Sequence, residues 1–309
     1  GLYLYDALRH TLEQNPIEYT EKLNSQQPLC CEVDNQGNVW IGSFDKGFAV
    51  YSNKQPIFNK NTNLNNTLKN IFTTRVIEDR YKNLWIGTRY QGIYHYNVHN
   101  NRTRIYDHTN ISAFKENNNL VEELFIDTQG HLWTVCEDRI LAGSFDEAGN
   151  YSLLRQIPLA SHSGSASIAE DRQGNLWFGL SHGLFLIRKG DIDGQFENIH
   201  QGNYTKVYPL SGGGLMFSVY GYGIYRMNGD FSLTPLEMPT PEATLLSQHC
   251  IDIFEDDQKR LWLGSYNEGV MYIRGDEYRM FDMTDGLPSN DIISIRADND
   301  GNIWMSTTY

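Results

Sequence analysis

Aromatic and planar polar residues gather in short segments a few residues after the tryptophans of this chain. One further segment of this kind follows Met216 instead of a tryptophan. Aromatic rings stack on the C–H faces of a sugar, and carboxylates, amides and guanidinium groups pair with its hydroxyls. The alternative is that several of these rings only pack against neighbouring loops. The candidate ligand-binding residues are Phe44, Asp45, Arg89, Tyr90, Arg139, His182, Tyr220, Tyr222, Tyr266, Asn267, Glu268 and Tyr309.

Signals for metal or catalytic chemistry are weak. The segments Asp191–Gly194 and Asp298–Gly301 resemble the opening of a calcium loop, but neither has a glutamate at loop position 12. Both therefore predict hairpin turns. His95 and His99 are four residues apart, but on a strand followed by a turn this spacing does not form a metal-binding face. We predict no metal, cofactor or catalytic residue, although a constellation assembled by long-range contacts stays open.

The four cysteines, Cys30, Cys31, Cys136 and Cys250, show no metal-ligand spacing. Isolated cysteines in strands are usually buried small hydrophobes, and this is the prediction for all four. The neighbouring Cys30 and Cys31 should point to opposite faces of one strand. A structural disulfide is the less favoured alternative, and cysteine usage does not identify the compartment.

The candidate segments belong to an internal repeat. All six tryptophans occupy one position of the repeat, and an aspartate stands six residues before each: Asp34 and Trp40, Asp79 and Trp85, Asp127 and Trp133, Asp171 and Trp177, Asp256 and Trp262, Asp298 and Trp304. The intervals between tryptophans are 45, 48, 44, 85 and 42 residues. The long interval holds a degenerate copy with Met216 in the tryptophan position. The chain therefore contains seven copies with a period of about 44 residues.

Each copy reads as a strand, a tight turn led by aspartate, a second strand with the tryptophan, a short loop and further strands. The aspartate should accept hydrogen bonds from backbone N–H groups two and three residues on. Short strands repeating every 40 to 50 residues are typical of β-propeller blades. The tryptophans would then fill the space between neighbouring blades. We identify no helix.

The two ends of the chain complete one blade. Gly1–Tyr5 matches Gly92–Tyr96, the third strand of a copy, and the C-terminus stops after the strand with Trp304. The sequence thus predicts an all-β fold: a single seven-bladed β-propeller over residues 1–309, its last blade closed by the N- and C-terminal strands. Post-tryptophan loops and inter-blade connections should share one face, with the aspartate-led turns on the other.

Composition limits the function further. The net charge of −13 repels polyanions, so we predict that this chain binds no nucleic acid. No apolar run reaches the roughly 18 residues needed to cross a bilayer. Because the chain begins and ends within a blade, we expect it to be a segment of a longer polypeptide, in which case missing targeting signals are uninformative.

The repeat resembles the two-component regulator propeller repeat. Asp171–Gly179 matches that pattern almost residue for residue, and Asp285–Asn290 resembles the lead-in to the family's last blade. The fifth copy departs from it by lacking both aspartate and tryptophan, and the third by having Val135–Glu137 in place of Gly-Thr.

The resemblance implies a non-catalytic sensor region in the periplasm, within an inner-membrane hybrid two-component system of gut bacteria. Such a region binds an oligosaccharide and passes the signal to a histidine kinase. It implies as partners a second propeller and a β-sandwich domain of the same chain, and a homodimer. Two alternatives stay open: a propeller enzyme such as a lyase or lactonase, and a structural propeller that mediates dimerisation. Which glycan is bound, and by which propeller, also stays open.

Overall fold

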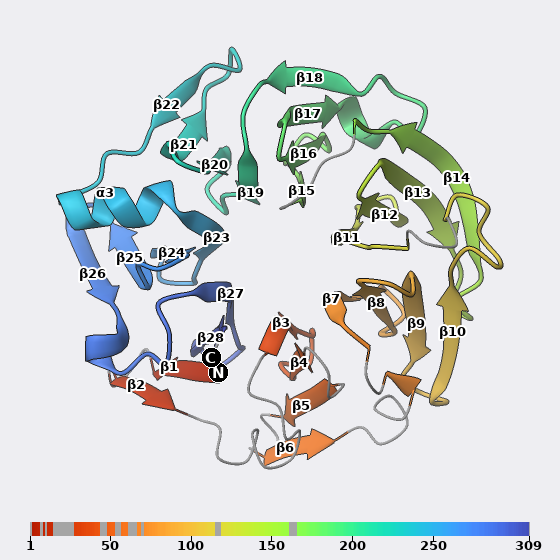
Figure 1. Cartoon of the computed structure of the whole chain (residues 1–309), viewed down its shortest axis with the longest axis horizontal. Helices are drawn as coiled ribbons and strands as arrows, with labels where there is room; N and C mark the ends of the chain where they lie inside the picture. The colour runs from red at the N-terminus through yellow and green to blue at the C-terminus, as the bar shows by residue number, and fades with distance from the viewer. Residues whose placement is uncertain are drawn as a thin grey trace.

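The structure is a computed structural model that describes residues 2–6, 9, 11–14, 28–43, 48–52, 57–60, 67–68, 71–114, 119–160 and 166–308. These residues form seven four-stranded antiparallel sheets. The sheets stand side by side around a central axis, each with its first strand innermost (Figure 1). The prediction of a seven-bladed propeller is confirmed.

Blades 1 to 7 are numbered here in chain order, and their strands run from the axis outwards. Blade 1 contains β3 (Pro28–Val33), β4 (Val39–Ser43), β5 (Phe48–Ser52) and β6 (Ile57–Lys60). Blade 2 contains β7 (Thr73–Glu78), β8 (Leu84–Thr88), β9 (Ile93–Asn97) and β10 (Arg102–Tyr106). Blade 3 contains β11 (Glu123–Ile126), β12 (His131–Cys136), β13 (Arg139–Phe145) and β14 (Tyr151–Pro158). Blade 4 contains β15 (Ser167–Glu170), β16 (Leu176–Leu180), β17 (Gly183–Ile187) and β18 (Glu197–His200), with the 3-10 turn η1 (Arg188–Gly190).

The remaining blades follow the same order. Blade 5 contains β19 (Tyr204–Pro209), β20 (Leu215–Val219), β21 (Gly223–Met227) and β22 (Leu233–Pro235). Blade 6 contains β23 (Cys250–Glu255), β24 (Leu261–Ser265), β25 (Val270–Arg274) and β26 (Glu277–Phe281), and the 3-10 turn η2 (Met283–Asp285) follows it. Blade 7 contains β27 (Ile292–Ala297), β28 (Ile303–Thr307), β1 (Leu2–Asp6) and β2 (Thr11–Gln14).

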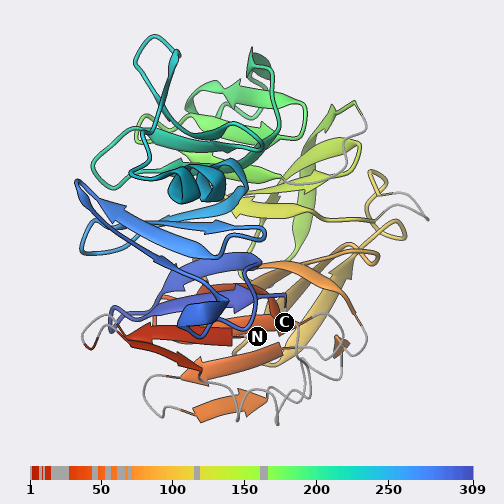
Figure 2. The same ribbon diagram turned by 60° about the vertical axis from the view of Figure 1, so that its left-hand side comes forward.

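Blade 7 joins the two ends of the chain. The N-terminal strand β1 lies antiparallel to β28, with Leu4 opposite Trp304 and Tyr5 opposite Ile303. The termini consequently lie beside each other in every view (Figures 1 and 2). This pairing confirms the predicted closure and leaves neither strand with a free inner edge.

The tryptophans fill the spaces between blades, as predicted. Trp85 of blade 2 packs with Leu132, Leu141 and Phe145 of blade 3, and Trp177 of blade 4 packs in the same way against blade 5. Trp85, Trp133, Trp177, Trp262 and Trp304 are almost fully buried, whereas Trp40 is half-buried. Met216 takes the tryptophan position in blade 5 and packs against blade 6.

The aspartate-led turns differ in one detail from the prediction. Asp171 Oδ1 accepts hydrogen bonds from the backbone N–H groups of Gln173 and Asn175, which are two and four residues on. The N–H three residues on, that of Gly174, donates to the backbone carbonyl of Asp171 instead, with φ of 77°. A left-handed residue is needed at this position, and Lys82 (φ 68°) supplies it in blade 2.

The expectation of no helix is wrong. Helix α3 (Pro241–Gln248) lies in the connection between blades 5 and 6. The side chain of Thr240 caps it by accepting from the N–H of Ala243, and Pro241 stands in the first turn. These are strong start signals. The segment has no repeat counterpart, so periodicity alone did not reveal it. No helix in the described part of the chain is long and apolar enough to span a bilayer.

All four cysteines are buried and free. Cys30 packs in the core between blades 1 and 2, and Cys31 packs in the core between blades 7 and 1. The two neighbours therefore face opposite sides of β3, as the alternation of a strand requires.

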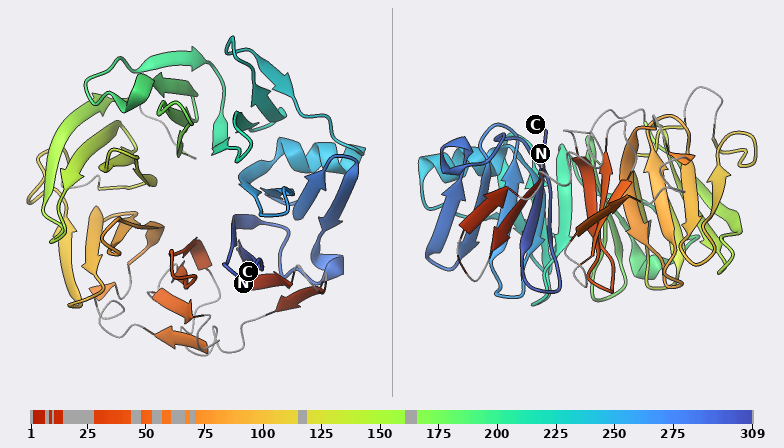
Figure 3. Two further views of the ribbon diagram at one scale, coloured as in Figure 1. Left: turned by 180° about the vertical axis from the view of Figure 1, so that it is seen from behind. Right: turned by 90° about the horizontal axis from the view of Figure 1, so that it is seen from below.

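The post-tryptophan loops are tied to the segments that enter each blade. The N–H of Arg89 donates to the carbonyl of Phe72 at 2.9 Å, and the N–H of Tyr220 donates to that of Asn203 at 2.9 Å. Loops and inter-blade connections therefore share one face, which we call the loop face, as predicted. The aspartate-led turns lie at the other end of the blades, seen edge-on in Figure 3.

Candidate functional site

Four of the predicted ligand-binding tyrosines are exposed on the loop face. They are Tyr90, Tyr220, Tyr222 and Tyr266, with exposed fractions of 68%, 39%, 74% and 40%. Large aromatic side chains usually bury most of their surface, and exposed rings such as these have faces on which a ligand can stack. The predicted residues Phe44, Asp45 and Tyr309 lie outside the described part of the chain.

Tyr220 and Tyr266 come from neighbouring blades and meet at the end of helix α3. The N–H of Gly221 donates to the carbonyl of Gln248 at 2.7 Å, and the N–H of Tyr266 donates to that of His249 at 3.1 Å. The last turn of the helix thus holds both loops. The ring of Tyr220 lies 5.7 Å from the imidazole of His249.

Polar groups surround the two rings. Glu268 Oε1 lies 3.7 Å from Nδ1 of His249. Asp291 Oδ1 accepts a hydrogen bond of 2.9 Å from the N–H of Asn267, and its Oδ2 accepts one of 3.1 Å from the hydroxyl of Thr308. Burial, together with the negative charge of Asp291 and the neighbouring Tyr220, raises the pKa of Tyr266, so its phenol keeps its proton.

We call this group the Tyr220–Tyr266 surface. It comprises Tyr220, His249, Tyr266, Asn267, Glu268 and Asp291. Two aromatic faces, two carboxylates, an amide and an imidazole give it both stacking surfaces and hydrogen-bonding groups. Among the described residues, no group of three His, Cys, Asp or Glu side chains is placed to hold a metal ion.

Other predicted residues lie elsewhere. Arg89 packs its guanidinium over the rings of Phe72 and Tyr90 in blade 2, at 5.1 and 5.7 Å from their centroids. His182 in blade 4 is half-buried against Phe185, and burial lowers the pKa of its imidazole. The Tyr220–Tyr266 surface does not include them.

Arg139 does not offer an open binding group. Its side chain is buried, donates to the backbone carbonyl of Ala113 and pairs with the carboxylate of Asp138. The residue begins β13 rather than standing in a loop. Its place after the tryptophan strand pointed to a loop position, but the turn in blade 3 is shorter.

Sequence reasoning missed His249 and Asp291. His249 directly follows helix α3, so the start signals at Thr240 and Pro241 could have led to it. Asp291 ends the lead-in to blade 7, next to the recognised Asp285–Asn290 segment. Neither residue is in a post-tryptophan loop, which is why the repeat did not single them out.

Two segments of the chain match the model of a known family. Residues 161–182 and 286–309 match the two-component regulator propeller family. The matched two-component regulator propeller segments contain Trp177 and Trp304 with the aspartate-led turns before them. No curated protein matches the chain.

Solved structures share the propeller fold. A streptogramin B lyase matches with a TM-score of 0.67 and 13% identity, over 100% of this chain and 95% of its own. PorZ, a surface component of the type-IX secretion system of Porphyromonas gingivalis, matches with a TM-score of 0.64 and 14% identity, over 83% of this chain and 40% of its own. The extracellular domain of a hybrid two-component system of B. thetaiotaomicron matches with a TM-score of 0.40 and 16% identity, over 99% and 51%. Identities this low report the fold alone.

Proposed function

We propose that this chain is a non-catalytic, extracytoplasmic sensor propeller of a hybrid two-component system, and that it binds an oligosaccharide on the Tyr220–Tyr266 surface. The observation that carries the proposal is the meeting of two exposed tyrosines from neighbouring blades beside Glu268 and Asp291. Tyrosine offers a stacking face and a hydroxyl at low conformational cost. The match to the two-component regulator propeller family supports the sensor role.

Signalling then follows from differential binding. The propeller works in the periplasm beside a second propeller and a β-sandwich domain of the same chain, in a homodimer that controls a histidine kinase. An oligosaccharide shifts the arrangement of these parts only by as much as its affinity differs between the two arrangements. The Tyr220–Tyr266 surface can provide such a difference because it spans blades 5, 6 and 7, which a neighbouring domain could cover or release.

The test is calorimetric titration of the purified chain with a panel of oligosaccharides, for the native protein and for Tyr220→Ala, Tyr266→Ala and Tyr278→Ala. Tyr278 is a matched control, because it is a tyrosine with the same exposed fraction of 40% on the outer strand β26. We expect one glycan class to bind and both loop-face variants to lose at least tenfold in affinity, about 1.4 kcal/mol. The control should bind like the native protein.

Three outcomes would reject the proposal. If no oligosaccharide binds, or if Tyr266→Ala and Tyr220→Ala bind like Tyr278→Ala, the Tyr220–Tyr266 surface is not the site. If chromatography shows that a bound glycan is cleaved, the chain is an enzyme and the alternative of a propeller lyase replaces the sensor.

A further inference from the structure

The innermost strands line the central channel with a ring of seven residues, six of which are polar. In each blade, the residue that belongs to this ring stands four positions before the first residue of the turn that follows the inner strand. The ring consists of Cys30, Arg75, Glu123, Ser167, Lys206, Asp252 and Ser294, all of which line one cavity. The repeat places the seven side chains at one height, but it does not determine their types.

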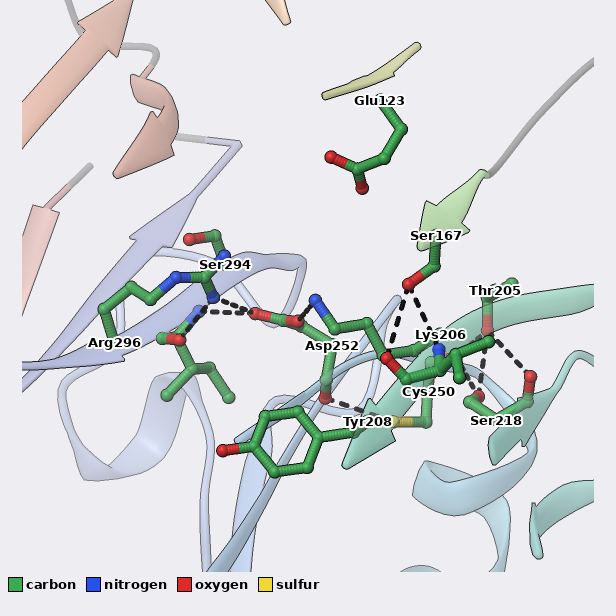
Figure 4. Close-up of polar contacts among 12 residues, drawn as sticks. Glu123, Ser167, Thr205, Lys206, Tyr208, Ser218, Cys250, Asp252, Ser294 and Arg296 are labelled. Carbon is green, nitrogen blue, oxygen red and sulfur yellow. Dashed lines mark hydrogen bonds and ion pairs between the residues drawn. The ribbon is translucent and has the colours of Figure 1, made fainter. Parts of the chain in front are cut away.

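Ion pairs connect the charged members in two groups. On one side, Arg75 Nε lies 3.0 Å from Glu123 Oε1. On the other, Asp252 pairs with Lys206 at 2.6 Å and with Arg296 at 3.1 Å. Figure 4 shows Glu123 across an open space from the Lys206–Asp252–Arg296 chain.

The second group extends to blade 1, where Arg296 Nε lies 3.3 Å from Glu32 Oε2. Asp252 is almost fully buried, and it also accepts from the N–H of Ile295 at 2.8 Å. Although burial opposes its charge, Lys206 and Arg296 hold the pKa of Asp252 below its ordinary value. Three cations and three anions therefore balance within these two groups.

Two residues closer to the turns, the lining is apolar in blades 2 to 6, whereas Glu32 and Arg296 stand at this level in blades 1 and 7. Ile77, Phe125, Tyr208 and Phe254 lie at this level. The rings of Tyr208 and Phe254 are 6.3 Å apart, edge to face. The cavity thus has charged groups at the upper level in blades 2, 3, 5 and 6 and at the lower level in blades 7 and 1, and a lower layer of aromatic and aliphatic side chains along blades 2 to 6.

The cavity volume of about 570 Å³ lies within the usual range for small-molecule sites. A ligand with a single charge would leave one charge unpaired among groups that already balance, and a buried unpaired charge is costly. A ligand with one positive and one negative group keeps the balance, with its anion at Arg75 or Lys206 and its cation at Glu123 or Glu32. Its apolar part can then reach the lower layer.

We propose that the channel is a second ligand site, separate from the Tyr220–Tyr266 surface, which binds a small zwitterion with a large apolar group, of the class of free aromatic amino acids and their dipeptides. The site lies along the axis where all seven blades meet. Its occupation would therefore brace the inner strands against one another.

The test titrates the native chain by calorimetry with phenylalanine, a phenylalanine dipeptide, N-acetylphenylalanine and phenylalanine amide. The last two carry only the negative or only the positive charge. We expect the zwitterions to bind and each single-charge analogue to bind at least tenfold more weakly. If no zwitterion binds at millimolar concentration, or if the analogues bind equally well, the proposal is wrong.

A double variant locates the site. Arg75→Met with Glu123→Gln removes both members of one ion pair, so no unpaired charge stays in the channel, and should reduce zwitterion affinity at least tenfold. The matched control is Arg188→Met with Glu197→Gln, which removes an exposed ion pair of 2.9 Å on blade 4. If the double variant does not fold, the analogue series on the native protein decides. Tyr266→Ala should keep zwitterion binding, so failure of this site and failure of the oligosaccharide site can be told apart.

Discussion

The indole Nε1 of Trp177 donates a hydrogen bond of 2.8 Å to Oδ2 of Asp171, six residues earlier. The same bond forms in the other five copies that have both residues, from Trp40 to Trp304, at 2.8 to 3.0 Å. Because Asp171 also accepts from the side-chain amide of Asn175, one carboxylate joins the turn to the core. This explains why the two residue types recur together at a fixed offset.

Replacing Trp177 by alanine should destabilise the domain by roughly 3–5 kcal/mol, because a large buried aromatic leaves a cavity. Trp177 is only 2% exposed and packs against Phe217 and Phe231. Urea unfolding measures the effect. Trp177→Phe keeps much of the packing but removes the N–H donor, so it should cost less. A loss within about 1 kcal/mol for the alanine variant would contradict the core role of Trp177.

Glutamates before three of the aspartate-led turns connect neighbouring blades. Glu170 accepts from the N–H of Thr128 at 2.8 Å and from its hydroxyl at 2.6 Å. Glu78 accepts from the backbone N–H of Asn35 at 3.3 Å, and Glu255 accepts from the backbone N–H of Ser211 at 2.8 Å.

Glu170→Ala should therefore lower the free energy of unfolding by about 1 kcal/mol, since bonds between blades 3 and 4 are lost. Glu147→Ala is the control, because Glu147 is exposed in the β13–β14 turn. Equal unfolding midpoints in urea for the two variants would show that the inter-blade bonds do not contribute to stability.

Glu122 should make stability depend on pH. Burial first, and then the charge of Glu137, raise the pKa of Glu122 to about 8, although Arg75 opposes the shift. In the unfolded chain the carboxyl has its ordinary value of 4.5. A raised pKa means that the folded state binds the proton of Glu122 more tightly than the unfolded state does. The stability that this proton contributes is therefore complete below pH 4.5, and it is lost as the pH rises to about 8.

Glu122→Gln should reduce the fall in the free energy of unfolding between pH 4.5 and about 8, and it should stabilise the protein above pH 8. Urea unfolding from about pH 4 to about pH 9 measures the slope. Glu147→Gln should keep the native slope. If Glu122→Gln keeps it as well, the carboxyl of Glu122 titrates normally in the folded protein.

Tyr90→Ala should weaken binding of a long oligosaccharide while binding of a disaccharide stays unchanged. Tyr90 lies in blade 2, whereas Tyr266 lies in blade 6, so only an extended ligand can contact both. Tyr222→Ala should weaken both ligands less than Tyr266→Ala, because Tyr222 is the more exposed ring. Neither variant should change the unfolding free energy by more than about 0.5 kcal/mol. Loss of disaccharide binding in Tyr90→Ala would place the site nearer blade 2.

The sequence by itself determined the number of blades, the closure between Gly1–Tyr5 and the Trp304 strand, and the buried role of the tryptophans. These features depend on contacts at fixed short offsets, such as the six residues between Asp171 and Trp177. A repeat records such offsets directly. Blade closure follows because each half-blade has unsatisfied backbone groups that only the other half can pair.

The tertiary structure alone decided which side chains meet. Tyr220, His249 and Asp291 lie on blades 5, 6 and 7, and helix α3 brings the loops together although it has no counterpart in the repeat. The ion pair between Arg75 and Glu123 likewise crosses from blade 2 to blade 3. Contacts between blades depend on the side-chain types at equivalent positions of the repeat and on the geometry of the closed ring. The repeat period encodes neither of these.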